Sequence, residues 1–149
     1  MKRILPLLSV TALVVGCTGP ASPSGPPSTQ TSSSALATRA EKVAFLQKYV
    51  TFRRTYVKLD YQIRYHNNSG GAVPGPSDWD IRIVAQVPAA ELVLWTSGLT
   101  AAGSADTGWL ADVSTTIDYS GVSSWFQSGS IVVGVDEQKS VVVYRNSTR

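Results

Sequence analysis

The only histidine of this 149-residue chain, His66, is its clearest candidate for acid–base chemistry. A serine-histidine-aspartate triad or a histidine general base would have to use it. His66 ends an alternating apolar/polar stretch and precedes a loop rich in Gly, Pro and Asn, a setting that suits both catalytic residues and solvated ones. Neither a GxSxG nor an HExxH pattern accompanies it, so the sequence predicts no catalytic residue.

The loop after His66 ends in Asp78-Trp79-Asp80, which places two carboxylates on the same side of an extended chain. Two oxygen donors are too few for calcium, which takes six to eight, so no metal site and no cofactor are expected. Trp79 can either pack onto the core or face a ligand, since aromatic rings serve both purposes. His66, Asp78 and Trp79 are therefore the candidate partner-binding residues.

Cys17 is the only cysteine, and the residues before it have the layout of a signal peptide. Lys2 and Arg3 form a short positive region, an apolar run follows from Ile4 to Val15, and Gly16 precedes the cysteine. A run of about a dozen residues is too short to span the hydrocarbon core of a bilayer as a helix. We therefore expect residues 1–16 to be cleaved.

Val14-Val15-Gly16-Cys17 resembles the lipobox of bacterial lipoprotein precursors, with an aliphatic residue three positions before the cysteine and Gly directly before it. The resemblance implies diacylglycerol on the Cys17 sulfur, and usually an acyl chain such as palmitate on the new amino terminus. Thr18 stands where the family's inner-membrane retention signal is Asp. The implied location is the cell envelope, lipid-anchored to a membrane, and the outer membrane where there are two.

Residues 17–35 are predicted to be the lipidated cysteine and a disordered tether, because Thr18 to Ser34 contain only Thr, Gly, Pro, Ser, one Ala and one Gln. Residues 36–149 then form a single globular domain. Without Lys2 and Arg3 the chain carries 11 basic and 10 acidic side chains. This balance, the export signal and the lack of a binding motif argue against a nucleic-acid partner.

The first half of the domain is predicted to be a helix and a hairpin. Thr38 and Glu41 have the spacing of a capping box, which predicts a helix from about Arg39 to Val50. Strict alternation over Tyr56 to His66, and again over Asp80 to Val87, predicts two antiparallel strands.

The second half begins with a helix after Pro88, buried through Leu92, Trp95 and Leu99 and ended at Gly98. Residues 101–108 read as loop, and Trp109-Leu110 as a short helical turn. Three strands complete an α+β fold, which we expect to be an antiparallel sheet of about five strands with two helices packed on one face. They are Ser124 to Gln127, Ile131 to Val135 and Val141 to Tyr144.

An anchor, a spacer and a compact domain without a catalytic constellation favour a non-enzymatic envelope protein that binds another macromolecule. The membrane, through Cys17, and an envelope or exported protein are the expected partners. Two alternatives stay open. One is an inhibitor or immunity protein that neutralises an enzyme or toxin, and the other is a hydrolase of envelope polymers that uses His66.

Overall fold

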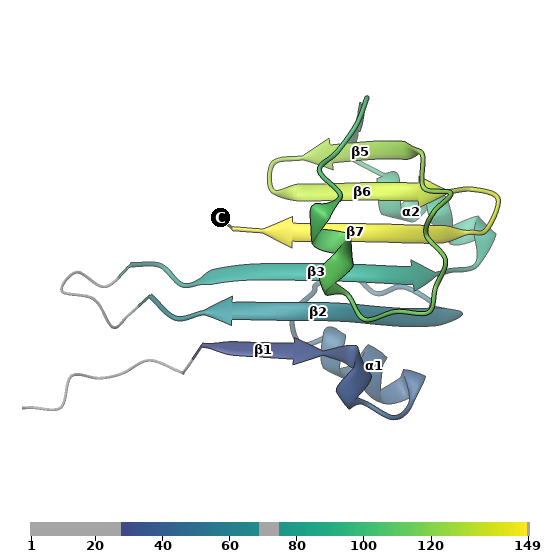
Figure 1. Cartoon of the computed structure of the whole chain (residues 1–149). Coiled ribbons are helices and arrows are strands. Elements are labelled where there is room, and N and C mark those ends of the chain that lie inside the picture. Colours follow the sequence, from purple (N-terminus) through teal and green to yellow (C-terminus); the bar gives the residue numbers. More distant parts are fainter. Residues whose placement is uncertain (1–27, 69–74, 149) are drawn as a thin grey trace, which may run out of the picture.

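A computed structural model describes residues 28–68 and 75–148, which form one antiparallel sheet of seven strands with two short α-helices. The strands lie in the order β1-β2-β3-β7-β6-β5-β4 (Figure 1). The predicted α+β class is confirmed, but about five strands was too few. Cys17 and the predicted signal peptide lie outside the described residues.

The five predicted strands are all present in the structure. The predicted hairpin is confirmed, because every residue of β2 pairs with one of β3, from Lys58 opposite Gln86 to His66 opposite Asp78. The C-terminal meander is also confirmed, and its apolar strands β6 and β7 lie inside the sheet, as expected. The bounds are β2 (Lys58–His66), β3 (Asp78–Gln86), β5 (Ser124–Ser128), β6 (Ile131–Asp136) and β7 (Val141–Ser147).

The two strands that the sequence did not predict are the short edge strands β1 (Thr29–Ser32) and β4 (Thr100–Ala102). β4 overlaps residues 101–108, which were predicted to be a loop, and it pairs with β5. β1 pairs with β2, and a 3-10 turn, η1 (Ser33–Ala35), follows it with Ser33 fully buried. The tether boundary at residue 35 was therefore wrong. Hydroxyl-bearing residues suit an exposed edge strand, and they gave no apolar signal.

The first helix, α1 (Arg39–Leu46), begins with the predicted capping box. The Glu41 amide donates to Thr38 Oγ1 at 3.2 Å, and the Thr38 amide donates to a Glu41 carboxylate oxygen at 2.9 Å. The helix ends at Leu46 instead of Val50, and the chain continues as a turn. Aromatic and β-branched residues dominate 49–52, and these lose side-chain freedom in a helix.

The predicted second helix is present as α2 (Leu92–Thr96), but it begins later than Pro88, because a 3-10 turn, η2 (Ala89–Glu91), comes first. Trp95 is buried, and Gly98 ends the segment with a φ of +78°, a left-handed conformation that glycine adopts without strain. Residues from α1 and α2 contribute to one apolar cluster on the same face of the sheet. That cluster includes Leu46, Trp95, Tyr61, Ile83, Val142 and Tyr144.

The opposite face of the sheet is covered by residues 107–123. The predicted turn at Trp109-Leu110 is η3 (Gly108–Asp112), which crosses in front of β7 and β3 in Figure 1. Trp109 and Leu110 pack against Val84 and Val143 of the sheet, and Thr115 donates a hydrogen bond to Asp60 on β2 at 2.8 Å. This cover leaves the His66 end of β2, the start of β3 and the end of β7 open on this face, where a pocket lies.

Candidate functional site

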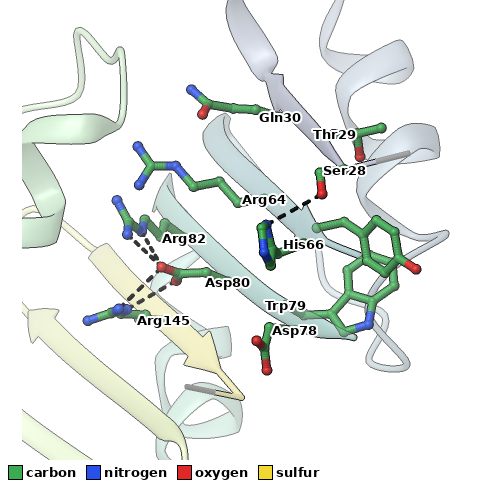
Figure 2. A pocket seen from close by; sticks show the side chains of 11 residues that line it. Ser28, Thr29, Gln30, Arg64, His66, Asp78, Trp79, Asp80, Arg82 and Arg145 are labelled. Carbon is green, nitrogen blue, oxygen red and sulfur yellow. Dashed lines mark hydrogen bonds and ion pairs between the residues drawn. The ribbon is translucent and has the colours of Figure 1, made fainter. Parts of the chain in front are cut away.

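The pocket has a volume of about 490 Å³ and lies on the open part of this sheet face (Figure 2). Alternation along the strands decides its lining: even-numbered side chains of β2 and β3 point to this face, while odd-numbered ones enter the apolar cluster under the helices. It therefore gathers polar side chains from four strands. The lining residues are Ser28, Thr29, Gln30, Arg64, Tyr65, His66, Asp78, Trp79, Asp80, Arg82 and Arg145.

Asp80 is held between two arginines. Its carboxylate accepts hydrogen bonds from Arg82 Nε at 3.0 Å and Nη2 at 2.5 Å, and from Arg145 Nε at 3.1 Å and Nη2 at 3.2 Å. Arg82 and Arg145 are cross-strand neighbours on β3 and β7, so the sheet register brings them together. Figure 2 shows both guanidinium groups converging on Asp80.

The chain of charges continues through Asp112 at the end of η3. Its carboxylate accepts a hydrogen bond from Arg82 Nη1, and the same oxygen lies 3.4 Å from Arg64 Nη2. The result is the alternating series Arg145, Asp80, Arg82, Asp112, Arg64, which carries one more positive than negative charge and ends in an arginine on each side.

These contacts keep the inner members of the series ionised. Burial alone would raise the pKa of Asp80, but hydrogen bonds and charges from Arg82 and Arg145 outweigh it and hold that pKa below its ordinary value. Burial would likewise lower the pKa of Arg82, and its bonds to Asp80 and Asp112 raise it instead. The centre of the site is therefore a fixed ion network over the pH range in which proteins usually work.

Arg64 is the least engaged of the three arginines. Its side chain is 38 % exposed, and its contact with Asp112 at 3.4 Å is the longest in the series. The Nε atom is buried and has no hydrogen-bond acceptor among the described residues. With a single long contact and a partly exposed side chain, Arg64 is the arginine of the series with the most capacity to bind a further anion.

Of the three residues predicted from sequence, His66 and Asp78 line the pocket as a cross-strand pair. The exposed imidazole lies with Nδ1 3.4 Å from Ser28 Oγ. The Asp78 carboxylate points away from that ring in Figure 2 and accepts a hydrogen bond from Asn68 Nδ2 at 2.8 Å. The two side chains are close in the fold, but they are not arranged as an acid–base pair.

Trp79, the third predicted residue, contributes to the pocket edge, but its ring packs on the helix side of the sheet. The ring centroid lies 4.6 Å from that of Tyr65 and 5.4 Å from that of Tyr49. Its backbone is fixed by Thr148, whose amide donates to the Trp79 carbonyl at 2.9 Å. Trp79 is thus an anchor for the start of β3.

The arginines were missed as a site because they come from distant positions in the sequence. Arg64 and Arg82 lie on the polar faces of strands that the alternation did predict, and nothing local connects either with Arg145. The sequence pattern links Asp80 only with Asp78, as a carboxylate pair with too few oxygen donors for a metal ion. In residues 28–68 and 75–148 no group of His, Cys, Asp or Glu side chains is arranged to hold a metal ion.

No protein-family model matches this chain, and none of the curated proteins or solved structures compared with it is significantly similar. Neither described α-helix is long and apolar enough to cross a bilayer.

Proposed function

We propose that this chain is a lipid-anchored cell-envelope protein whose folded domain binds a partner macromolecule through an anionic group of that partner. The lipobox resemblance at Cys17 supports the proposed location at the cell envelope. The observation that carries the binding role is the arginine-lined pocket, whose volume of about 490 Å³ lies in the range of ligand sites. Its ion series has one surplus positive charge and ends at the half-exposed Arg64.

The position of the pocket suits a tethered binding domain. Ser28, Thr29 and Gln30 form one wall, and they follow directly on the Pro- and Ser-rich segment predicted to lead from Cys17. A partner bound there would lie beside the point where the tether joins the domain. The domain would then hold that partner near the membrane.

One contact favours a second candidate function, a hydrolase. Ser28 Oγ lies 3.4 Å from His66 Nδ1, a pairing of nucleophile and base that hydrolases use. In such triads a carboxylate orients the other side of the imidazole, whereas Asp78 points away from it and is bound by Asn68. Ser28 and His66 are also both exposed, so water is not excluded. The geometry supports binding better.

The test is recovery of a partner from envelope extract with the purified full chain in a non-ionic detergent. We expect one protein to be retained by the unaltered chain and lost with Arg64→Gln combined with Arg145→Gln. Lys139→Gln is the charge control, since it removes a positive charge from the turn before β7, away from the pocket. Equal recovery with the double arginine variant would overturn the proposal.

His66→Ala separates the two functions. If the chain is a binding protein, this variant retains the partner, whereas in a hydrolase it abolishes turnover without unfolding the domain. Where the recovered partner is itself an enzyme, loss of that enzyme's activity on binding identifies the chain as an inhibitor.

A further inference from the structure

The internal partners of the pocket arginines indicate which anion the pocket takes. Asp80 and Asp112 are both carboxylates, and Arg145 spans both oxygens of Asp80 with Nε and Nη2, while Arg82 places its Nε and Nη2 on one of them. A planar fork matches the two oxygens of a carboxylate. Asp112 is 44 % exposed and reaches the arginines from η3, outside the sheet, as an external carboxylate would.

The remaining features favour a carboxylate over a phosphate. The series has a surplus of one positive charge, which a singly charged group neutralises, and the negative charge of Asp78 at the other end of the pocket repels a dianion more strongly than a monoanion. Phosphate sites commonly use backbone amides at a helix N-terminus. This pocket is lined by strand residues and by Ser28, which precedes β1.

The wall formed by β1 points to a polypeptide as the source of the carboxylate. β1 pairs with β2 along one edge and is the outermost strand of the described sheet. Thr29 and Gln30 line the pocket from this strand. An extended peptide added to such an edge gains backbone hydrogen bonds, and a side chain on its pocket face would lie beside Gln30, from where a long acidic side chain reaches across toward Arg64, the cross-strand partner of Gln30.

We propose that the pocket binds the carboxylate of an acidic residue in an extended polypeptide, that Arg64 is the anchor, and that Asp112 is an internal competitor that the ligand displaces from Arg64. This inference rests on the proposed function and specifies its ligand. Removing the Asp112 charge should therefore strengthen binding, and removing the Arg64 charge should weaken it.

The test is a titration of the full chain, in detergent and labelled with ¹⁵N, in which the arginine Nε–Hε signals are followed by NMR. The probes are acetyl-Thr-Val-Glu-Val-Thr-amide and its Gln and phosphoserine counterparts at the central position. We expect saturable shifts of the Arg64 signal with the Glu peptide, no saturable shift with the Gln peptide, and no tighter binding with phosphoserine.

The variants give opposite effects. Arg64→Gln should weaken binding of the Glu peptide about tenfold, as expected for loss of one charge-assisted contact. Arg64→Lys should not restore it, because a point charge lacks the fork. Asp112→Asn should tighten binding by roughly threefold to tenfold on the same energy scale, while Asp118→Asn, which removes an exposed charge paired with Lys139, should leave it unchanged.

Thermal melts of each variant establish that it is folded. No shift at Arg64 with any peptide, tighter binding of phosphoserine, or weaker binding by Asp112→Asn would overturn the inference. If the partner is still recovered from envelope extract in an arginine-dependent manner, only the ligand assignment fails. If that recovery fails as well, the proposed function falls with it.

Discussion

Asp80 and Arg82, two positions apart on β3, project from the same face of the sheet, and their side chains meet at 2.5 Å with only 14 % and 7 % of their surfaces exposed. Arg145 reaches the same carboxylate from β7. One acidic residue therefore bonds two arginines inside the site. The pair is the structural centre of the pocket.

Asp80→Asn should reduce the free energy of unfolding by about 2–4 kcal/mol, because it leaves a buried guanidinium without its principal counter-charge. Urea denaturation of the variant and the unaltered chain measures this loss. Asp118→Asn, at the exposed pair with Lys139, is the control and should change the unfolding curve little. Equal effects of the two substitutions would show that the network is not stabilising.

The same carboxylate should make stability depend on pH. Since the pKa of Asp80 is lower in the folded than in the unfolded chain, its contribution is fully present above the unfolded value, near 4, and is lost as the pH falls through the folded value. Unfolding measured between pH 7 and pH 2 should therefore lose less stability in Asp80→Asn than in the unaltered chain. Parallel curves would contradict the lowered pKa.

Ser33→Ala tests whether the domain begins before residue 36. Ser33 Oγ accepts a hydrogen bond from the Tyr61 amide at 3.0 Å and donates one to Asp60 at 3.2 Å, and the side chain is fully buried. Its loss should cost about 1–3 kcal/mol, because the buried amide loses its acceptor. Ser34→Ala, at an exposed position, should cost little in the same denaturation experiment. A neutral Ser33→Ala would return residues 33–35 to the tether.

The local sequence pattern predicted those elements of the fold that depend only on residues close together in the chain. The alternation over Tyr56 to His66 appears as β2, which begins two residues later at Lys58, and the capping box at Thr38 appears as predicted, because each depends on residues close together in sequence. β1 and β4 were missed because their side chains are mostly polar or small, and pairing with a distant strand is what makes them strands. No local pattern encodes that pairing.

The candidate site shows the same contrast between local sequence patterns and long-range strand pairing. The sequence links His66 and Asp78 because they bracket one loop, and the hairpin does bring them together. The arginine network joins positions 64, 80, 82, 112 and 145, which become neighbours only through the strand order β2-β3-β7 and the course of η3. A prediction from sequence would have needed that strand order first.

Gly134 on β6 should not tolerate a side chain. It lies opposite Trp125 on β5, and a Cβ built at position 134 would come within 2.7 Å of the indole ring and 2.6 Å of Val122 Cγ1. Gly134→Ala should cost about 1–3 kcal/mol through overpacking. Gly103→Ala, where a Cβ meets nothing within 4 Å, is the matched control. Similar melting temperatures for the two variants would show that the ring moves freely.

Trp79 should behave as a structural residue. Its ring contacts Tyr65 and Tyr49 at centroid distances of 4.6 and 5.4 Å, and it is partly buried against the helix-side cluster. Trp79→Ala should therefore reduce the free energy of unfolding by about 2–4 kcal/mol, somewhat less than for a fully buried tryptophan. Trp79→Phe should recover much of this loss, because it keeps an aromatic ring between the two tyrosines.

Partner recovery from envelope extract separates this role from direct binding by Trp79. At a temperature where Trp79→Ala is still folded by circular dichroism, the variant should retain the partner, because the ring lies on the face opposite the arginines. Loss of the partner from a folded Trp79→Ala, with Trp79→Phe also inactive, would instead show that the indole ring itself contacts the partner. The contact surface would then extend beyond the pocket arginines to the edge of the pocket that Trp79 forms.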